Sequence, residues 1–452
     1  MEGYAVQRQI IENDNKSRKF FYITAAFSAL VPEYFSFALA FIALCIFMRD
    51  IRKQILKFRI TGCVAVMVAY LAWRFIGIFY SADIFGGAAF FLMWLLMFFG
   101  AIIPALVIDS VERLERTSLL LTLSGGFAGG VGIVQILLFH YGKYIHPDLR
   151  SMFNPFWNFF NVAVAKIATL SFFPQWLADR LPRSEPIHIF SRANSTFTNP
   201  VFFAIFIIMV IPFAVYCLFE LKDKRLRALS FFCLACMVCG IALSYTRSAY
   251  LALAAVVVVM IFMGKRQAIC VAVLSPLMLF AFPSGVYKRL LSIFDFTDVS
   301  ISTRLNIWEA AVDIIKENPV FGIGTGFEPF RKILVEEYSI KQPHAHNIAL
   351  QTLVENGAIG LLLLAVFAVY FLVEMIKICR KSKKFKALGV TFIASAAGLF
   401  VCSVTDYPFY GPKLLQYFFI IAGLSQAARL VSVKVEKEEK PKEEKLAETA
   451  NK

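Results

Sequence analysis

The chain has 452 residues, of which 59% are hydrophobic and only 17% are charged, and its formal net charge is +15. Soluble globular proteins carry roughly 45–50% apolar and about 25% charged residues, so a water-soluble enzyme of two or three domains is excluded. The positive charges punctuate apolar blocks and form no basic polar domain, so no nucleic-acid partner is expected. The composition predicts an all-α polytopic membrane protein in contact with membrane lipids.

The first apolar stretch, residues 19–48, is broken at Pro32-Glu33 and fits either one long span or two short ones. Lysine and arginine near span ends prefer the cytoplasm, and basic residues flank this stretch on both sides. We therefore predict two short helices that turn at Pro32, after a cytoplasmic amino end of residues 1–18 without a signal peptide. The flanking residues are Arg8, Lys16, Arg18 and Lys19 before the stretch, and Arg49, Arg52, Lys53, Lys57 and Arg59 after it.

Ten further apolar segments are candidates to cross about 30 Å of hydrocarbon at about 1.5 Å per residue. Together with the hairpin they predict twelve spans: 1–5 within residues 19–139, 6–9 within 199–283 and 10–12 within 348–430. Later basic clusters then lie inside, and the tail, 431–452, is predicted to be a charged, disordered cytoplasmic extension. The ten segments are 60–80, 85–108, 117–139, 199–219, 228–245, 249–263, 267–283, 348–373, 387–405 and 413–430.

Two long stretches, 140–198 and 284–347, are external under this assignment. In the first, residues 157–173 are apolar but include Asn158, Asn161 and Lys166, which favours a re-entrant or interfacial helix over a full span. All five histidines fall on the outer side, which indicates an outward-facing active site, although polar loops also tolerate histidine. They are His140, His146, His188, His344 and His346. The nine cysteines lie in or beside apolar segments, so no disulfide framework is expected.

Two arginines lie beside predicted span ends on the outer side. Arg192 precedes the span that starts with Asn199 as a possible cap and Pro200 at the first helical position. Arg247 lies between two spans that have almost no loop between them. Its side chain therefore either reaches lipid headgroups or faces a cavity for an anionic ligand.

A third arginine, Arg304, lies in the second outer loop, where helical spacing begins. We predict a helix capped by Ser302 or Thr303 that ends at Asn318-Pro319. Arg304 would then lie in its first turn, where free N–H groups attract anions, which predicts a phosphate site. The alternative is an arginine paired with a nearby glutamate or a lipid headgroup.

The segment after this helix contains Gly322, Gly324 and Gly326. A dinucleotide fingerprint would need glycine at position 327, which is Phe, and a preceding strand, so this function is rejected. The glycines instead predict a tight turn with positive φ angles that leads back toward the membrane.

The segment Pro343-His344-Ala345-His346-Asn347 enters the next span. Two histidines could bind a metal, but no cysteine or close aspartate in the sequence completes a ligand set, so no metal is expected. A neutral imidazole can instead remove a proton from a hydroxyl group. We therefore predict His346 as a general base held at the start of the span, with His344 in support.

In this order the motifs resemble the O-antigen ligase and polymerase superfamily of bacterial membrane glycosyltransferases, which also includes O-linked oligosaccharyltransferases. The family's ligase signature is a histidine followed by Asn, Ser or Gln, nine residues, Gly-x-x-Gly, and Thr or Val. His346 and Asn347 are followed by nine residues, Gly357 and Gly360, but Leu361 departs from the last position. The other matching residues are Arg192 with Asn199-Pro200, Thr246-Arg247-Ser248, Arg304 with Trp308, and Pro319-x-x-Gly322-x-Gly324.

The resemblance implies a membrane-embedded C-type glycosyltransferase-like architecture in the bacterial inner membrane, with the active site facing the periplasm. The donor would be a glycan on undecaprenyl pyrophosphate, and the acceptor lipid A-core or another glycan. Arginines can meet the charge of the leaving pyrophosphate without a carboxylate pair, and attack opposite this group would invert the anomeric centre. No cofactor is implied. The implied catalytic residues are His346, Arg247 and Arg304, and with them we group Arg192, His344, Asn347, Trp308 and Asn199 as substrate-binding residues.

Other functions fit parts of the sequence. Within the superfamily, a repeat-unit polymerase or an O-linked oligosaccharyltransferase would use the same donor with another acceptor. A transporter of anionic lipids could also use rim arginines, but transporters place charges near the membrane midplane, whereas these gather beside histidines at the outer rim. A non-catalytic scaffold would leave the arginines and histidines unexplained.

Overall fold

A computed structural model describes residues 16–31, 33–53, 61–145, 192–262, 267, 269–274 and 299–450. Within these ranges the protein is helical and has no strand. Among the described residues, seven helices are long and apolar enough to cross a membrane, and α4 (Gly62–Ile76) and α12 (Arg247–Met260) are shorter apolar helices. The chain is therefore an all-α polytopic membrane protein. The predicted total of twelve spans, the helix at 157–173 and most of the segment 267–283 lie outside the described residues and stay predictions.

The amino-terminal hairpin is confirmed. Helix α2 (Lys16–Phe27) and helix α3 (Glu33–Arg52) are separate, with the break at the predicted place. Ser17, at the start of α2, donates from its backbone N and its Oγ to Asp50 Oδ2 at 2.9 and 2.7 Å, near the end of α3. The two helices are therefore antiparallel, and the described basic residues at the start of α2 lie at the same end of the bundle as those at the end of α3.

Helix α10 (Pro200–Glu220) forms the centre of the bundle. Every residue from Phe202 to Cys217 is buried, because α6 (Val111–Ile145), α11 (Lys224–Ser244) and α18 (Lys383–Ser403) pack around it. A helix that is apolar on all sides can be covered in this way without exposing polar groups. Around this centre, α5 (Ile84–Val107) packs against α19 (Pro412–Ala450), and α12 packs against α18.

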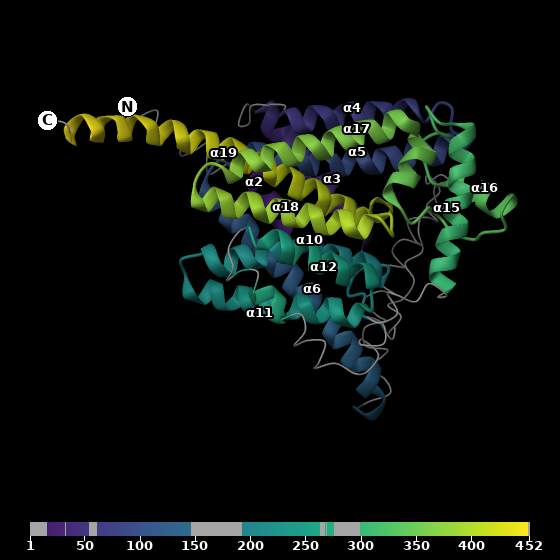
Figure 1. Cartoon of the computed structure of the whole chain (residues 1–452), viewed down its shortest axis with the longest axis horizontal. Helices are drawn as coiled ribbons and strands as arrows, with labels where there is room; N and C mark the ends of the chain where they lie inside the picture. The colour runs from purple at the N-terminus through teal and green to yellow at the C-terminus, as the bar shows by residue number, and fades with distance from the viewer. Residues whose placement is uncertain are drawn as a thin grey trace.

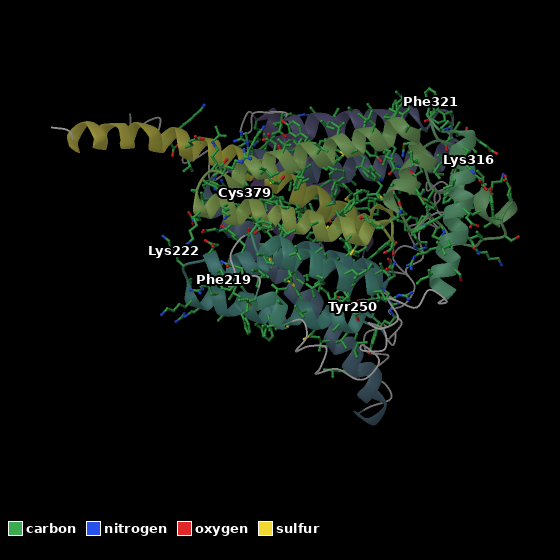
Figure 2. All side chains as sticks on the ribbon, in the orientation of Figure 1. Phe219, Lys222, Tyr250, Lys316, Phe321 and Cys379 are labelled. Carbon is green, nitrogen blue, oxygen red and sulfur yellow. The ribbon has the colours of Figure 1, made fainter. Side chains whose placement is uncertain are left out.

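The two ends of the bundle carry different residues. Lys222 and Cys379 lie at one end, and Tyr250, Lys316 and Phe321 at the other (Figure 2). At the first end an ion pair of 2.7 Å joins Lys384 Nζ to Glu115 Oε1. We call this the basic end and the opposite one the rim end. Helices α15 (Val299–Glu317) and α16 (Glu328–Glu336) lie at the rim end, whereas α19 leaves the bundle at the basic end (Figure 1).

One predicted helix boundary is wrong. Helix α15 begins at Val299, so Ser302 and Thr303 are not its cap and Arg304 does not lie in its first turn. Neither glycine nor proline occurs between Val299 and Arg304, so nothing stops the helix from starting earlier. The argument that the helix amino terminus and Arg304 share an anion therefore fails. The end of α15 at Glu317, before Asn318-Pro319, is confirmed.

The carboxyl-terminal tail is also corrected. The prediction made residues 431–452 disordered, but α19 continues as a helix to Ala450. Lysine and glutamate are both strong helix formers, and opposite charges four residues apart add stability to an exposed helix. A low content of bulky apolar residues therefore does not exclude helix here. All nine cysteines are free in the structure.

Helix α17 (Ile348–Cys379) is kinked at Gly357, whose φ and ψ are 63° and −167°. The kink frees backbone groups, and the glycine turn before α16 satisfies them. Ile323 and Gly324 donate their N–H groups to the carbonyls of Val354 and Glu355, at 2.8 and 3.1 Å. A Cβ on Gly357 would lie 2.1 Å from the carbonyl oxygen of Val320, so this position requires glycine for space as well as for its positive φ.

The predicted glycine turn is confirmed in its backbone. The φ angles of Gly322, Gly324 and Gly326 are 72°, 103° and 119°. Thr325 binds helix α4 from within this turn, with its N–H donating to Gly77 O at 3.0 Å and its Oγ1 to Arg74 O at 2.6 Å. The turn therefore joins α4 to the kink of α17 and fixes where α17 begins.

We predict from the two ends of the bundle that the basic end is cytoplasmic and the rim end external. Reporter fusions after residues 54, 145, 223, 320 and 382 should read inside, outside, inside, outside and inside, because lysine and arginine clusters resist translocation. A cytoplasmic reading at 320 contradicts both the topology and an outward-facing site.

Candidate active site

The histidine segment lies directly before α17. Asn347 caps this helix, with its Oδ1 accepting from the N–H groups of Ala349 at 2.9 Å and Leu350 at 3.0 Å. His346 precedes the cap and has a left-handed backbone, with φ at 49°. Such a backbone costs a residue other than glycine about 1–2 kcal/mol, so the surroundings must hold it. The backbone N–H of His346 donates to Nδ1 of His344 at 3.2 Å.

An aspartate from another part of the chain completes this group. Asp406 lies between α18 and α19, and its Oδ1 is 3.4 Å from Nδ1 of His346. The ring centroids of His344 and His346 are 4.1 Å apart. The amide nitrogen of Asn347 donates to Val404 O at 3.0 Å and so holds the two segments together. We call His344, His346 and Asp406 the His–Asp cluster.

Burial and neighbouring groups shift the pKa values of His344 and Asp406 in this cluster. Burial lowers the pKa of His344 to about 4, helped by the neighbouring charges of His346 and Arg304. Burial raises the pKa of Asp406, but the interaction with the adjacent His346 imidazole and the hydrogen bond from the Tyr407 N–H outweigh burial and hold that pKa below its ordinary value. At neutral pH, His344 is therefore uncharged and Asp406 is ionised. Because Nδ1 of His344 accepts a hydrogen bond, its proton lies on Nε2.

Asp406 changes the argument about metals. The ligand atoms of the three cluster residues all lie within 4.8 Å of one another, so they could hold a metal ion. Two histidines and a carboxylate are also a known donor set for catalytic zinc. The sequence argument against a metal depended on the lack of a third ligand nearby, and the fold supplies that ligand from a distant segment. The cluster can therefore act either through proton transfer or as a metal site.

Helix α15 contacts the histidine segment through Trp308. The indole Nε1 donates to the carbonyl of Ala345, the residue between the two histidines, at 2.9 Å. Arg304 lies one turn earlier on the same helix, and its charge acts on His344. The structure thus brings Arg304, Trp308 and both histidines together. Trp308, predicted to bind substrate, uses its only polar atom to hold the backbone at the site.

Arg192 and Arg247 lie together at the turn between α11 and α12. Arg192 donates from Nε to Ser244 O at 2.9 Å and from Nη2 to Thr246 Oγ1 at 3.3 Å, so it braces this turn. Arg247, half-buried, is the first residue of α12. Its neighbour Ser248 hydrogen-bonds the thiol of Cys402, four residues before Asp406. The start of α12, where Arg247 lies, is thus near the end of α18, which precedes the segment that carries Asp406.

Asn199 acts as the predicted helix cap, since its Oδ1 accepts from the N–H of Phe202 at 2.8 Å. The oxygen and the nitrogen of the Asn347 amide likewise form hydrogen bonds within the protein. Both residues therefore have structural roles that account for their position, and substrate binding by them stays a prediction.

Sequence reasoning missed Asp406. It follows a span and is separated from His346 by two helices, so no local spacing connects the two residues. One signal was available: Asp406 is the only acidic residue between Glu374 and Glu436, and it lies at a predicted outer span boundary. An isolated carboxylate at the end of a span is costly in the membrane and often functional.

Comparison with curated proteins found no match. A family model described as O-antigen ligase matches residues 232–365, a range that includes Arg247, Arg304, Trp308 and both cluster histidines but not Arg192, Asn199 or Asp406. Members of this family are membrane glycosyltransferases of the ligase type. Residues 232–365 are therefore similar to the O-antigen ligase family, and this match supports a relationship to the O-antigen ligase superfamily.

Proposed function

We propose that this protein transfers a glycan from undecaprenyl pyrophosphate to an acceptor hydroxyl on the outer face of the inner membrane, with lipid A-core as the acceptor. The observation that carries the proposal is the pairing of His346 with a buried aspartate at the rim end, at 3.4 Å. A carboxylate at Nδ1 orients an imidazole and stabilises its protonated form, which leaves Nε2 to accept a proton. The O-antigen ligase domain supports the general reaction class.

In the proposed reaction, His346 removes the proton from the acceptor hydroxyl as its oxygen attacks the anomeric carbon. The bond from that carbon to the pyrophosphate oxygen breaks, and the configuration at the anomeric carbon inverts. His344 stays neutral through its lowered pKa of about 4. It therefore adds no fixed positive charge beside the base, and it supports the His346 backbone through its Nδ1.

Arg247 and Arg304 are proposed to bind the pyrophosphate of the donor. Arg247 is the first residue of α12, which packs against α18. Arg304 lies on α15, whose Trp308 contacts the histidine segment. Guanidinium groups can donate two parallel hydrogen bonds to a phosphate, and the charge on the leaving oxygen grows as the bond breaks. Arg192 supports this role indirectly by fixing the turn that presents Arg247.

The prenyl chain of the donor is proposed to lie in an apolar groove between α17 and α18, with a cavity volume of about 560 Å³. Ile348, Ala349 and Ser403 line the groove at the rim end, directly after His346 and just before the Asp406 segment. A donor in this groove would have its head group beside the His–Asp cluster. The remaining lining residues are almost entirely apolar, as a hydrocarbon chain requires.

The acceptor is tested by incubating the purified protein with one lipid-linked glycan and three acceptors in parallel: lipid A-core, a second lipid-linked glycan and a pilin-like protein. Transfer to lipid A-core, measured as a mass increase of that acceptor, is the expected result. Extension of the second lipid-linked glycan would make the protein a polymerase, and modification of the pilin an O-linked oligosaccharyltransferase. Movement of the donor across vesicles without any transfer would indicate a transporter.

We predict that His346→Ala lowers the transfer rate about 10²–10⁴-fold while donor binding persists, because general-base catalysis has this magnitude. Asp406→Asn should also lower the rate, since the amide no longer stabilises the imidazolium, and His344→Ala should cost less than His346→Ala. Asp313→Asn, at an exposed position on α15, is the matched control. The rates are measured with and without a chelator. Loss of parent activity on chelation and its return with zinc would mean that the cluster binds a metal.

We also predict that Arg247→Lys and Arg304→Lys each lower the transfer rate about 10²-fold or more. Lysine keeps the charge but cannot donate the paired hydrogen bonds that a guanidinium offers to a phosphate. The control is Arg331→Lys, whose side chain is exposed on α16. Protein yield and thermal stability in detergent should match the parent for all three variants. Parent rates in both test variants would show that these arginines only anchor lipid headgroups.

A further inference from the structure

A fully buried ion pair lies behind the candidate site. Arg74 of α4 and Glu355 of α17 both have side chains that are 0% exposed, with Nη2 2.9 Å from Oε2. Arg74 also donates to the Tyr70 hydroxyl at 3.2 Å, and its guanidinium lies 4.7 Å from the centroid of the Trp94 ring. A buried ion pair is rarely more stabilising than apolar residues of similar volume. The proposed reaction does not use this pair, so its presence needs another reason.

Gln351 connects the pair to the peptide between the two histidines. Its Nε2 donates to Glu355 Oε1 at 2.7 Å, and its Oε1 accepts from the N–H of Ala345 at 2.7 Å. The carbonyl of Ala345 is held from the other side by Trp308. Because the Glu355 carboxyl group accepts from Arg74 at Oε2 and from Gln351 at Oε1, it orients the Gln351 amide so that the amide oxygen faces Ala345. The backbone at the centre of the histidine segment is therefore fixed on both sides.

Arg74 also reaches the segment that carries the aspartate. The Tyr407 side chain is buried near Arg74, close enough for the guanidinium charge to act on its hydroxyl. The N–H of the same residue donates to Asp406 Oδ1 at 2.8 Å. One buried guanidinium is thus connected to the histidine segment through Glu355 and Gln351, and it also lies near the residue that follows Asp406.

The backbone of His346 shows why such support is needed. A left-handed conformation at a residue other than glycine persists only where its surroundings over-determine it. The φ of His346 is 49°, and the preceding residue is the one held by Gln351 and Trp308. The direction of the His346 ring toward Asp406 follows from this backbone conformation.

We propose that Arg74 and Glu355 are positioning residues, which act through Gln351 on the two histidines and through Tyr407 on Asp406. They set the distance and direction between His346 and its aspartate and do not touch the substrate. This inference rests on the proposed function, in which that distance and direction determine the rate. A displacement of about 1 Å at a reacting group can cost about 10²-fold in rate.

The first test removes the connection but keeps the pair. Gln351→Met has a similar volume and loses both hydrogen bonds, so the turnover of glycan transfer should fall about 10–10²-fold. The KM for the lipid-linked donor should stay within about twofold of the parent, since the donor arginines are untouched. Gln426→Met, at another buried glutamine on α19, is the control and should leave both constants unchanged. Parent turnover in Gln351→Met would overturn the proposal.

The second test separates positioning from stability. Arg74→Met or Glu355→Leu alone leaves a buried charge unpaired and should lower thermal stability strongly. The double variant Arg74→Met with Glu355→Leu removes both charges and should restore the melting temperature, yet turnover should stay at least about 10-fold low. Return of turnover together with stability would show that the pair only supports the fold. If the double variant does not fold, Gln351→Met decides the question.

A third measurement is independent of glycan transfer. In protein with ¹³C- and ¹⁵N-labelled histidine, the ring signals of His344 and His346 are assigned from the His→Ala variants. Gln351→Met should shift both sets of signals, whereas Gln426→Met should not. Shifted signals with no transfer by the parent protein would mean that the proposed function fails while the positioning network stands. Unshifted signals in Gln351→Met would remove the network even if the parent is active.

Discussion

The kink of α17 at Gly357 determines how the rim end is built. A helix within a membrane protein must satisfy all its backbone groups, because hydrocarbon offers no hydrogen bonds. The kink leaves the carbonyls of Val354 and Glu355 without partners in the helix, and the glycine turn from Ile323 to Gly326 supplies the N–H groups. The first segment of α17 thereby takes a fixed direction. Asn347, Gln351 and Glu355 all lie on that segment, so the position of the histidines depends on one glycine.

The protonation states at the site depend on how deeply each residue of the His–Asp cluster is buried and on which groups it faces. His344 is buried and loses its affinity for a proton, whereas Asp406 is buried but retains its charge because it faces His346. Neighbouring titratable groups whose pKa values are pushed apart are a usual sign of acid–base roles. His346 is the member of the cluster with the most exposed side chain, at 20% against 6% for Asp406. It is thus the member of the cluster that is most accessible from outside the protein.

Charge and local chemistry were enough to predict much of the bundle. The basic flanks of residues 19–48 predicted the hairpin that the Ser17–Asp50 contact confirms, and Asn199 was identified as a cap from its place before Pro200. Glycine at positions 322, 324 and 326 predicted the turn. These features depend on neighbours in the sequence. The start of α15 was missed because several residues can begin a helix when no glycine or proline intervenes.

The part of the site that the sequence could not reveal depends on contacts between distant segments. Asp406 joins His346 only because α17 and α18 pack together, and Arg74 joins Glu355 only because α4 packs against α17. Trp308 shows the same limit in another way. Its place beside Arg304 predicted substrate binding, but its indole N–H donates to Ala345 O. In a helical bundle, a polar side chain can form its hydrogen bond either with a neighbouring segment of the protein or with a ligand. Which of the two it does depends on how the helices pack, and the sequence alone does not show this.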